Sequence, residues 1–460
     1  MLSKRYAQDW SASKFSTSVR YRKENAAAFG RFTRQPQASA MELLRNGRPR
    51  VVITGLGAVT ALGPVKELWE SLKAGRSGIR RIETIPIEHV PVQIGGEVRG
   101  FTTDGYLDHK EARRMGRASQ FAVVASAQAV EDAGFGRDGI EAIGERVGIV
   151  IGSSLGPHEM AEQSTFKYKT TGFRKPNPLS LINSLPNMPA HYVSRFLQAL
   201  GPMTAPSTAC ASGTQSIGEA SELVKAGRVD VVIAGGVESV LQDYAIAGFD
   251  AMDALAKGYN DNPEAASRPF DKNRSGFIFS EGCGIVVMES LAHALKRGAH
   301  IYGEVLGHAS SSDAYHIAAL PPEGKGAIRC MKWALEDAHL SPDKIGYINA
   351  HGTSTPQNDA METLAIKNVF GEQAYNIPIS STKSMIGHAL GGAGAIEVIA
   401  CLKSMVEQVL HPTINYETPD EDCDLDYVPN VARDVQNLKY VLSNSFGLGG
   451  QNASIVLGTV

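Results

Sequence analysis

The sequence predicts a mixed α/β fold, and three observations support this prediction. Apolar segments that end in glycine recur along the chain, stretches with helical spacing alternate with them, and the alternation runs through two similar rounds. The 460 residues exceed one ordinary domain, and hydrophobic residues make up 43% of them, which is enough for a substantial core. The periodicity by itself therefore predicts an α/β fold that is duplicated.

The first round opens with an apolar strand at residues 50–60, which carries a Gly-x-Gly and so invites a nucleotide-binding interpretation. A dinucleotide fingerprint also needs a third glycine near position 60, where Thr60 stands, so the pattern does not meet it. Further strands are expected at 147–152, 229–236 and 282–288, and helices at 119–134 and 213–227.

The second round repeats this alternation in the last third of the chain. A strand is expected at 299–306, followed by a helix at 324–338. A strand leading to His351, a helix at 358–368, a strand leading to His388 and a long helix at 394–407 complete the round. Both histidines are therefore expected at strand ends.

Residues 1–40 differ from the rest of the chain in charge. They hold eight Lys and Arg and two acidic residues, which leaves the remainder with 37 basic and 46 acidic residues and a net charge of −9. The segment is either an organellar (mitochondrial or plastid) transit peptide or a dispensable extension of a cytoplasmic enzyme, and we favour the second. The acidic remainder gives no support for nucleic-acid binding, and no apolar run approaches the length of a membrane span.

The five cysteines are scattered without C-x-x-C spacing, which argues for a reducing compartment and against disulfides and zinc. Four of them are interpreted as plain core or surface thiols: Cys283, Cys330, Cys401 and Cys423.

Cys210 lies where a strand ends and a helix begins, among small residues. The N–H groups and the positive end of the helix dipole favour a thiolate there and can hydrogen-bond an oxyanion on an acyl group attached to the sulfur. A buried structural cysteine is the competing interpretation. His351 and His388 each follow an apolar segment amid Ser, Thr and Gly, and one cysteine with two such histidines favours nucleophilic catalysis.

Four segments together resemble one known family. They read Thr-Ala-Cys-Ala-Ser-Gly at 208–213, Asn-Ala-His-Gly-Thr-Ser-Thr-Pro at 349–356, Ser-Ser-Thr-Lys-Ser-Met-Ile-Gly-His at 380–388 and Asn-Ser-Phe-Gly-Leu-Gly-Gly at 444–450. In this order they resemble the elongating beta-ketoacyl acyl-carrier-protein synthases of fatty acid synthesis, above all the second, long-chain type. The resemblance covers roughly residues 50 to 460.

The resemblance implies a duplicated thiolase-like fold of two βαβαβαββ halves, layered α/β/α/β/α. Residues 1–49 would then be a disordered basic extension, 50–300 the half with the nucleophile and 301–460 the half with both histidines. It also implies a homodimer, acyl carrier protein as the partner, and no metal or organic cofactor.

The resemblance further assigns the chemistry. Cys210 would hold the acyl chain as a thioester, and His351 and His388 would stabilise the enolate formed when malonyl loses CO2. Lys383 and Glu397 match a supporting ion pair. Thr353 and Thr355 match hydroxyls that bind the pantetheine arm.

The family also has a gate and a docking site. Phe446 matches the gating aromatic at the acyl pocket, its backbone N–H joins that of Cys210 in the oxyanion hole, and Leu155 falls where the gate has its partner. Arg113 and Arg114 match basic residues that receive the acidic carrier, although a solvated helix face is the plainer interpretation of such a cationic run.

Four residues at three places depart from the family pattern and leave gating and chain-length preference open. Ser275 replaces an acid, Gln451 stands where Thr or His is usual, and Leu179-Ser180 replaces two aromatic residues of the acyl pocket. A related ketosynthase of a polyketide or other specialised lipid is therefore the alternative function. A third alternative is a non-condensing protein of the same fold, a chain-length partner that has lost the active cysteine. This class is disfavoured, because Cys210 is present.

Overall fold

The computed structural model describes residues 43–174 and 176–460. The expectations for residues 1–40, a targeting peptide or a dispensable extension, lie outside the described residues. Strands β1 (Leu44–Arg45) and β2 (Arg48–Pro49) form a small antiparallel pair. Arg45 and Arg50 both pair with the buried carboxylate of Glu304. The folded chain therefore already includes residues that the sequence assigned to the extension.

The central feature is one mixed sheet of ten strands in which the same order occurs twice. The first-half strands are β3 (Val51–Thr60), β6 (Val147–Gly152), β7 (Met203–Thr204), β8 (Val231–Glu238) and β9 (Gly282–Ser290). The second-half strands are β10 (Gly303–Ser312), β11 (Tyr347–Asn349), β12 (Ile379–Ser380), β15 (Tyr440–Gly447) and β16 (Gln451–Gly458).

From the outer edge inward, the strand order is β7-β6-β8-β9-β3 in the first half and β12-β11-β15-β16-β10 in the second. In chain order within each half, this is the third, second, fourth, fifth and first strand. In each, the second strand is parallel to the third and fourth, and the fifth is antiparallel to both its neighbours. A short antiparallel pairing of β3 with β10 joins the halves. The duplication predicted from periodicity is confirmed, while the division at residue 300 stays a prediction.

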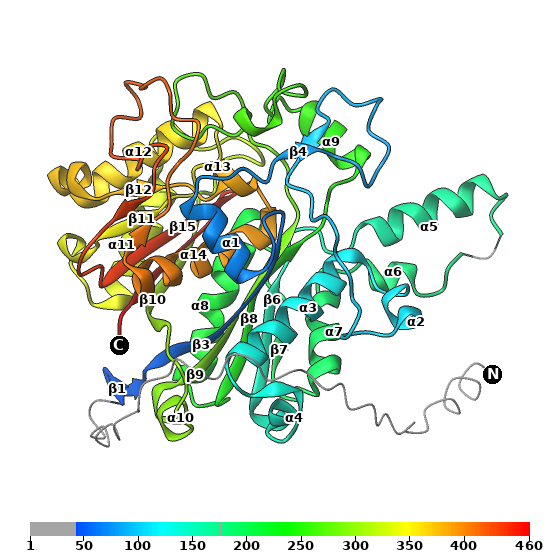
Figure 1. The fold of residues 1–460 in the computed structure, drawn as a ribbon, viewed down its shortest axis with the longest axis horizontal. Helices are drawn as coiled ribbons and strands as arrows, with labels where there is room; N and C mark the ends of the chain where they lie inside the picture. Colours follow the sequence, from blue (N-terminus) through cyan, green and yellow to red (C-terminus); the bar gives the residue numbers. More distant parts are fainter. Residues whose placement is uncertain (1–42, 175) are drawn as a thin grey trace. The chain divides into compact units, whose positions relative to one another are not determined.

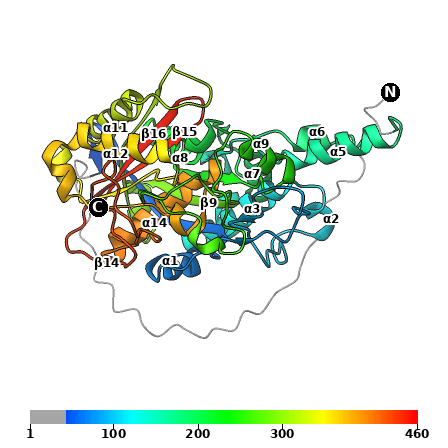
Figure 2. The same ribbon diagram turned by 90° about the horizontal axis from the view of Figure 1, so that it is seen from above.

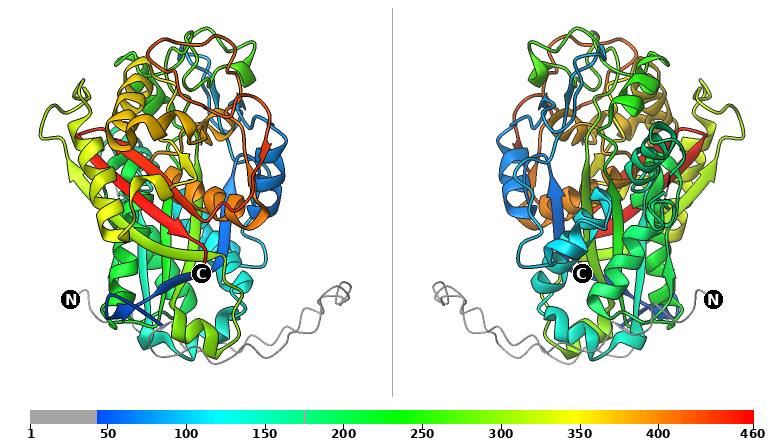
Figure 3. Two further views of the ribbon diagram at one scale, coloured as in Figure 1. Left: turned by 90° about the vertical axis from the view of Figure 1, so that its left-hand side faces the viewer. Right: turned by 90° about the vertical axis from the view of Figure 1, so that its right-hand side faces the viewer.

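Helices separate and cover the two half-sheets in five layers, and Figure 2 shows the same elements from above. Helices α3 (Arg117–Asp132) and α7 (Met188–Leu197) cover the first half, and α11 (Lys325–Ala338) and α12 (Pro356–Phe370) cover the second. In the left view of Figure 3 the yellow helix α11 lies on the opposite side of the red strands from the blue helix α1 (Val65–Lys73).

The middle layer consists of α8 (Ser212–Lys225) and α14 (Ala393–Glu407), which pack against each other and against strands of both halves. Most of α14 is buried, because its sequence is apolar around the whole helix. Gly213 permits the close approach, since a Cβ there would lie 2.8 Å from the backbone nitrogen of Ala395. This contact brings the segment around Cys210 against the segment that follows His388.

Two predicted strands are wrong in detail. The strand predicted to lead to His388 ends at Ser380, because α13 (Lys383–Ile386) turns the chain before Gly387 at φ +74°. His388 instead bridges to Phe279, with its N–H donating to the Ile278 carbonyl at 2.7 Å. The strand expected at 299–306 begins at Gly303 and runs to Ser312, because its polar end pairs with β16, a partner that an apolar pattern cannot reveal.

Among residues 43–174 and 176–460, no helix combines the length and the apolar character needed to cross a bilayer.

Candidate active site

Cys210 occupies the turn between β7 and α8, within the 3-10 turn η2 (Ala209–Ala211). Ala209 has φ +48°, a left-handed conformation that is strained for a residue with a Cβ. Ser212 stabilises the turn, since its hydroxyl donates to the Ala209 carbonyl at 2.7 Å and accepts from the Thr208 N–H at 2.9 Å. The thiol is only 5% exposed.

The expectation of a resting thiolate at Cys210 is wrong. Burial raises the pKa of this thiol to about 11, and the charge of Lys383 and a hydrogen bond from the Leu448 N–H offset the burial only in part. Desolvation in the protein interior thus outweighs the local field of the helix. Cys210 rests as a neutral thiol and must lose its proton during the reaction.

His351 and His388 lie against each other, with ring centroids 5.3 Å apart and planes 82° apart. The ring of Phe446 packs edge-on against His351 and that of Phe277 against His388. Burial and the nearby charge of Lys383 lower the pKa of both imidazoles well below the ordinary value. Both rings are therefore neutral at physiological pH, and each has one N–H donor.

Lys383 and Glu397 form the ion pair that the family motif implied, and both side chains are buried. Lys383 Nζ also lies 3.3 Å from Nδ1 of His351. Because an ammonium group can only donate, Nδ1 of His351 must accept, which places the ring proton on Nε2. The ion pair thus determines which ring nitrogen of His351 acts as the donor.

The reactive groups converge on one cavity of about 380 Å³. Six side chains chosen from the sequence line it: Cys210, His351, Thr353, Thr355, His388 and Phe446. The hydroxyls of Thr353 and Thr355 lie 3.0 Å apart, so they form one polar stretch of wall. Leu320, Leu390 and Leu448 supply apolar parts of the cavity wall.

Three predicted residues lie away from this cavity. Leu155 is 42% exposed and is not among the described residues that line it. Arg113 and Arg114 are exposed at the end of α2 (His109–Ala112), beyond the cavity wall. Their neighbour Arg117 points inward to the buried Glu281, so the basic run is divided between surface and interior.

Two buried carboxylates that the sequence analysis missed hold the site from behind. Glu362 accepts the N–H groups of His351 and Gly352, each at 2.8 Å. Glu238 accepts the N–H groups of Ser154 and Gly391, and so joins a loop of each half. The sequence feature that could have identified Glu362 is its position as an acidic residue on the apolar face of the helix that follows the His-Gly-Thr turn.

The three departures from the family pattern lie in different surroundings. Ser275 lines the cavity, Gln451 begins β16, and Leu179 is exposed. Ser180 is buried, and its hydroxyl donates to the Asn177 carbonyl at 2.9 Å. Of these departures, only Ser275 therefore borders the cavity.

Two family descriptions match the chain in succession. "Beta-ketoacyl synthase, N-terminal domain" matches residues 48–294, and "Beta-ketoacyl synthase, C-terminal domain" matches residues 302–417. A cysteine in the first half and two histidines in the second, which line one cavity, fit this class of acyl-transferring enzyme. The chain belongs to the beta-ketoacyl synthase family.

Similar proteins extend this result over most of the chain. The 3-oxoacyl-(acyl-carrier-protein) synthase 2 of Synechocystis sp. is 44% identical over 409 residues, which are 89% of this chain and 97% of that protein. The synthase of the same name from Staphylococcus aureus (strain COL) is 46% identical over 408 residues, 88% of this chain and 97% of that one. A type II polyketide ketosynthase in complex with its acyl-carrier protein has a TM-score of 0.82 at 37% identity, covering 90% of this chain and all of that one. The fold is therefore the duplicated thiolase fold.

Proposed function

We propose that the protein is a 3-oxoacyl-(acyl-carrier-protein) synthase that elongates fatty acids by decarboxylative condensation. The observation that carries this proposal is the shared cavity of Cys210, His351 and His388, in which both rings are neutral hydrogen-bond donors. The names of the relatives at 44% and 46% identity support the same activity.

The first step transfers the acyl chain to Cys210. The sulfur attacks the thioester carbonyl of the acyl carrier, and the carrier's own thiol leaves. Backbone N–H groups of Cys210 and Phe446 are proposed to stabilise the oxyanion of this step. The neutral thiol needs a proton acceptor, and the neutral imidazoles in the same cavity are the available bases.

The second step forms the carbon nucleophile. Malonyl loses CO2, and the electron pair of the broken C–C bond becomes an enolate on the malonyl thioester. Nε2–H of His351 and the N–H of His388 are proposed to stabilise its oxygen. Two neutral rings suit this role, because a hydrogen bond to the enolate stabilises it without transferring a proton too early.

The third step joins the two units. The enolate carbon attacks the acyl carbonyl on Cys210, the sulfur leaves, and the thiol recovers a proton. The net products are 3-oxoacyl carrier protein, CO2 and free carrier. Thr353 and Thr355 are proposed to hold the pantetheine arm during the second and third steps, because their paired hydroxyls face the cavity.

The test is a reconstituted reaction of acyl carrier proteins of graded chain length with malonyl carrier protein, followed by mass spectrometry of protein and product. Fatty-acid elongation is supported by transfer of saturated chains to Cys210 and by formation of the 3-oxoacyl product. A polyketide ketosynthase, which the 37% identical structure represents, would instead accept the polyketone chain it has made and extend it repeatedly. No acylation of Cys210 by any carrier-bound chain would refute both.

Arg113 and Arg114 are proposed as the docking site for the acidic carrier. Reversing both to glutamate should lower kcat/KM with carrier-bound substrate by about 10- to 1,000-fold at low ionic strength, because electrostatic steering is lost. The dependence on salt should flatten, while turnover with a small acyl-pantetheine thioester should stay unchanged. Stopped-flow or steady-state assays at several salt concentrations measure both.

The matched control reverses Arg80 and Arg81, an exposed pair in β4 (Arg80–Arg81), which changes the net charge by the same amount at another place. An equal loss in the control would mean that net charge, rather than the docking position, steers the carrier. An equal loss with both substrates would show that Arg113 and Arg114 are structural.

A homodimer is also proposed, with the first halves of two subunits in contact. Helix α5 (Glu159–Thr170) extends away from the body and buries no residue (Figure 1), and Phe166 and Leu181 are largely exposed nearby. Strand β7 pairs with β6 alone within the described chain, which leaves one edge free for a second copy. An obligate interface would bury about 2,000 Å² or more, so sedimentation at micromolar concentration should show only dimer. A monomer under these conditions would contradict the proposal.

A further inference from the structure

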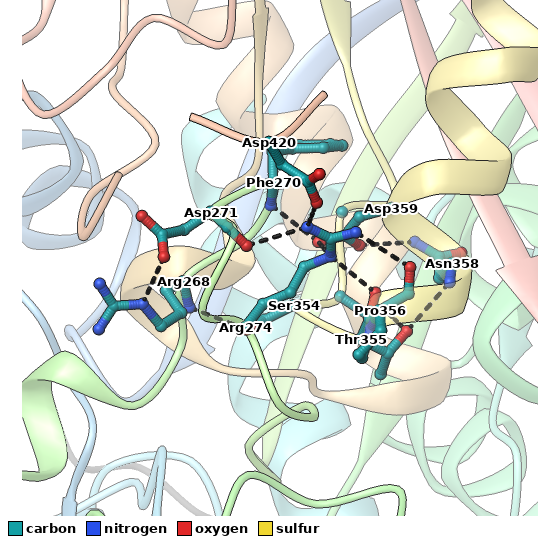
Figure 4. Close-up of polar contacts among 12 residues, drawn as sticks. Arg268, Phe270, Asp271, Arg274, Ser354, Thr355, Pro356, Asn358, Asp359 and Asp420 are labelled. Carbon is teal, nitrogen blue, oxygen red and sulfur yellow. Dashed lines mark hydrogen bonds and ion pairs between the residues drawn. The ribbon is translucent and has the colours of Figure 1, made fainter. Parts of the chain in front are cut away.

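Arg274 is a buried cation next to the cavity that touches neither the substrate space nor any reactive group. Its side chain is only 5% exposed. The guanidinium donates to the carbonyls of Thr355 at 3.3 Å and Pro356 at 3.1 Å, and to the carbonyl of Asp271 at 2.9 Å. A fourth bond, at 2.5 Å, goes to a carboxylate oxygen of Asp420. Figure 4 shows Arg274 between these groups.

These bonds connect two walls of the cavity. One wall is residues 275–277, which directly follow Arg274, and the other is formed by Thr353 and residues 355–358, where α12 begins. One further hydrogen bond crosses between the same segments, from the Gly276 N–H to the Ser354 carbonyl, and next to them the Phe270 N–H donates to the carboxylate of Asp359. Among the described residues between these two walls, Arg274 is the only cationic side chain that donates hydrogen bonds to backbone carbonyls of a wall, those of Thr355 and Pro356.

The fork of the guanidinium matters to this arrangement. One planar group supplies divergent N–H donors to two successive carbonyls and a carboxylate, which fixes the distance between the loop and the helix. An ammonium group has the same charge but cannot reach all of these acceptors in fixed directions. The carboxylates of Asp359 and Asp420 lie close enough to balance the buried charge.

We propose that Arg274 is a positioning residue that fixes the spacing of the two walls and thereby holds Thr353 and Thr355 ready for the pantetheine arm. The inference rests on the proposed function, since it needs a thioester arm between the walls. It goes beyond that function because it assigns a role to a side chain that does not contact the substrate. In this role Arg274 controls the affinity for the pantetheine arm and leaves the rate of the chemical step unchanged.

Arg268 provides a matched comparison in the same cluster. It is equally buried, but its guanidinium pairs with Asp271 and Glu417, neither of which lines the cavity. Figure 4 shows this side chain pointing away from the Thr355–Pro356 segment. If the effect were a general loosening of the cluster, replacing either arginine should produce it. A change in the spacing of the two cavity walls should follow only from replacing Arg274.

The experiment compares Arg274→Lys, Arg268→Lys and the natural protein in decarboxylation of malonyl-pantetheine. Arg274→Lys should raise KM by about 10- to 100-fold while kcat stays within about twofold, because the arm is misplaced and the reactive groups are not. Alkylation of Cys210 by iodoacetamide, which has no arm, should keep its rate. Arg268→Lys should change neither KM nor the alkylation rate.

Asp420→Asn serves as a second variant should Arg274→Lys fail to fold, because it weakens the anchor of Arg274 and leaves every wall residue in place. It should raise KM in the same direction by a smaller factor. An unchanged KM in these variants, a parallel fall in alkylation, or an equal effect of Arg268→Lys overturns the inference. If the natural protein neither decarboxylates malonyl-pantetheine nor acylates Cys210, the proposed function fails first, so the two failures are distinguishable.

Discussion

Replacing Cys210 with glutamine should abolish condensation while malonyl decarboxylation continues. Glutamine cannot form a thioester, so the acyl chain has no attachment and condensation should fall by about 1,000-fold or more. His351 and His388 remain in the cavity and can still stabilise the enolate. Product analysis should therefore find acetyl carrier protein and CO2 in place of the 3-oxoacyl product.

Chemical labelling checks the same assignment in the natural protein. All five cysteines are buried, and Cys210 is the one that lines the cavity in the described chain. A cerulenin-type epoxide should therefore modify Cys210 alone, as read by peptide mapping, and Cys423→Ala should label normally. Because the pKa of Cys210 is raised to about 11, its alkylation rate should increase about 10-fold per pH unit from pH 7 to 9. Label on another cysteine with Cys210 untouched would refute the assignment.

Replacing either His351 or His388 with alanine should lower malonyl decarboxylation by about 100- to 1,000-fold, because each removes one hydrogen-bond donor to the enolate oxygen. The two donors act on one atom, so the double variant should lose less than the product of the single effects. Release of CO2 from malonyl carrier protein measures this step separately from condensation.

His300 is exposed and distant in sequence from every motif, and His300→Ala is the control for histidine loss in general. Decarboxylation that survives in both His351→Ala and His388→Ala would remove the histidines from the enolate role. A loss confined to His351→Ala would mean that the ring held by Lys383 acts alone.

Much of the fold and of the site followed from local sequence. The strands at 50–60, 147–152 and 229–236 were predicted close to their observed bounds, because strands covered on both faces must be apolar along their whole length. The candidate residues Cys210, His351 and His388 were chosen because they stand among Ser, Thr and Gly after apolar segments, and because their motifs resemble those of one family. Their types and their local turns are fixed by neighbours in sequence.

The sequence did not determine what surrounds these residues. The thiolate expected at Cys210 is a neutral thiol, because packing removes water that the local helix field cannot replace. Glu362 and Glu238 hold the loops of the site from segments far along the chain. Leu155, placed at the gate by its motif, is exposed and outside the cavity of the described chain.

By itself, then, the sequence determined the duplicated α/β fold, the motif residues and the chemistry that a cysteine with two histidines can perform. Only the tertiary structure decided that these groups share one cavity, which depends on the close approach of α8 and α14 at Gly213. It also decided the protonation of Cys210, the donor nitrogen of His351 and the role of Arg274 behind the wall. The physical reason is that residue type sets what a group can do, whereas desolvation and hydrogen bonding depend on what distant segments bring against it.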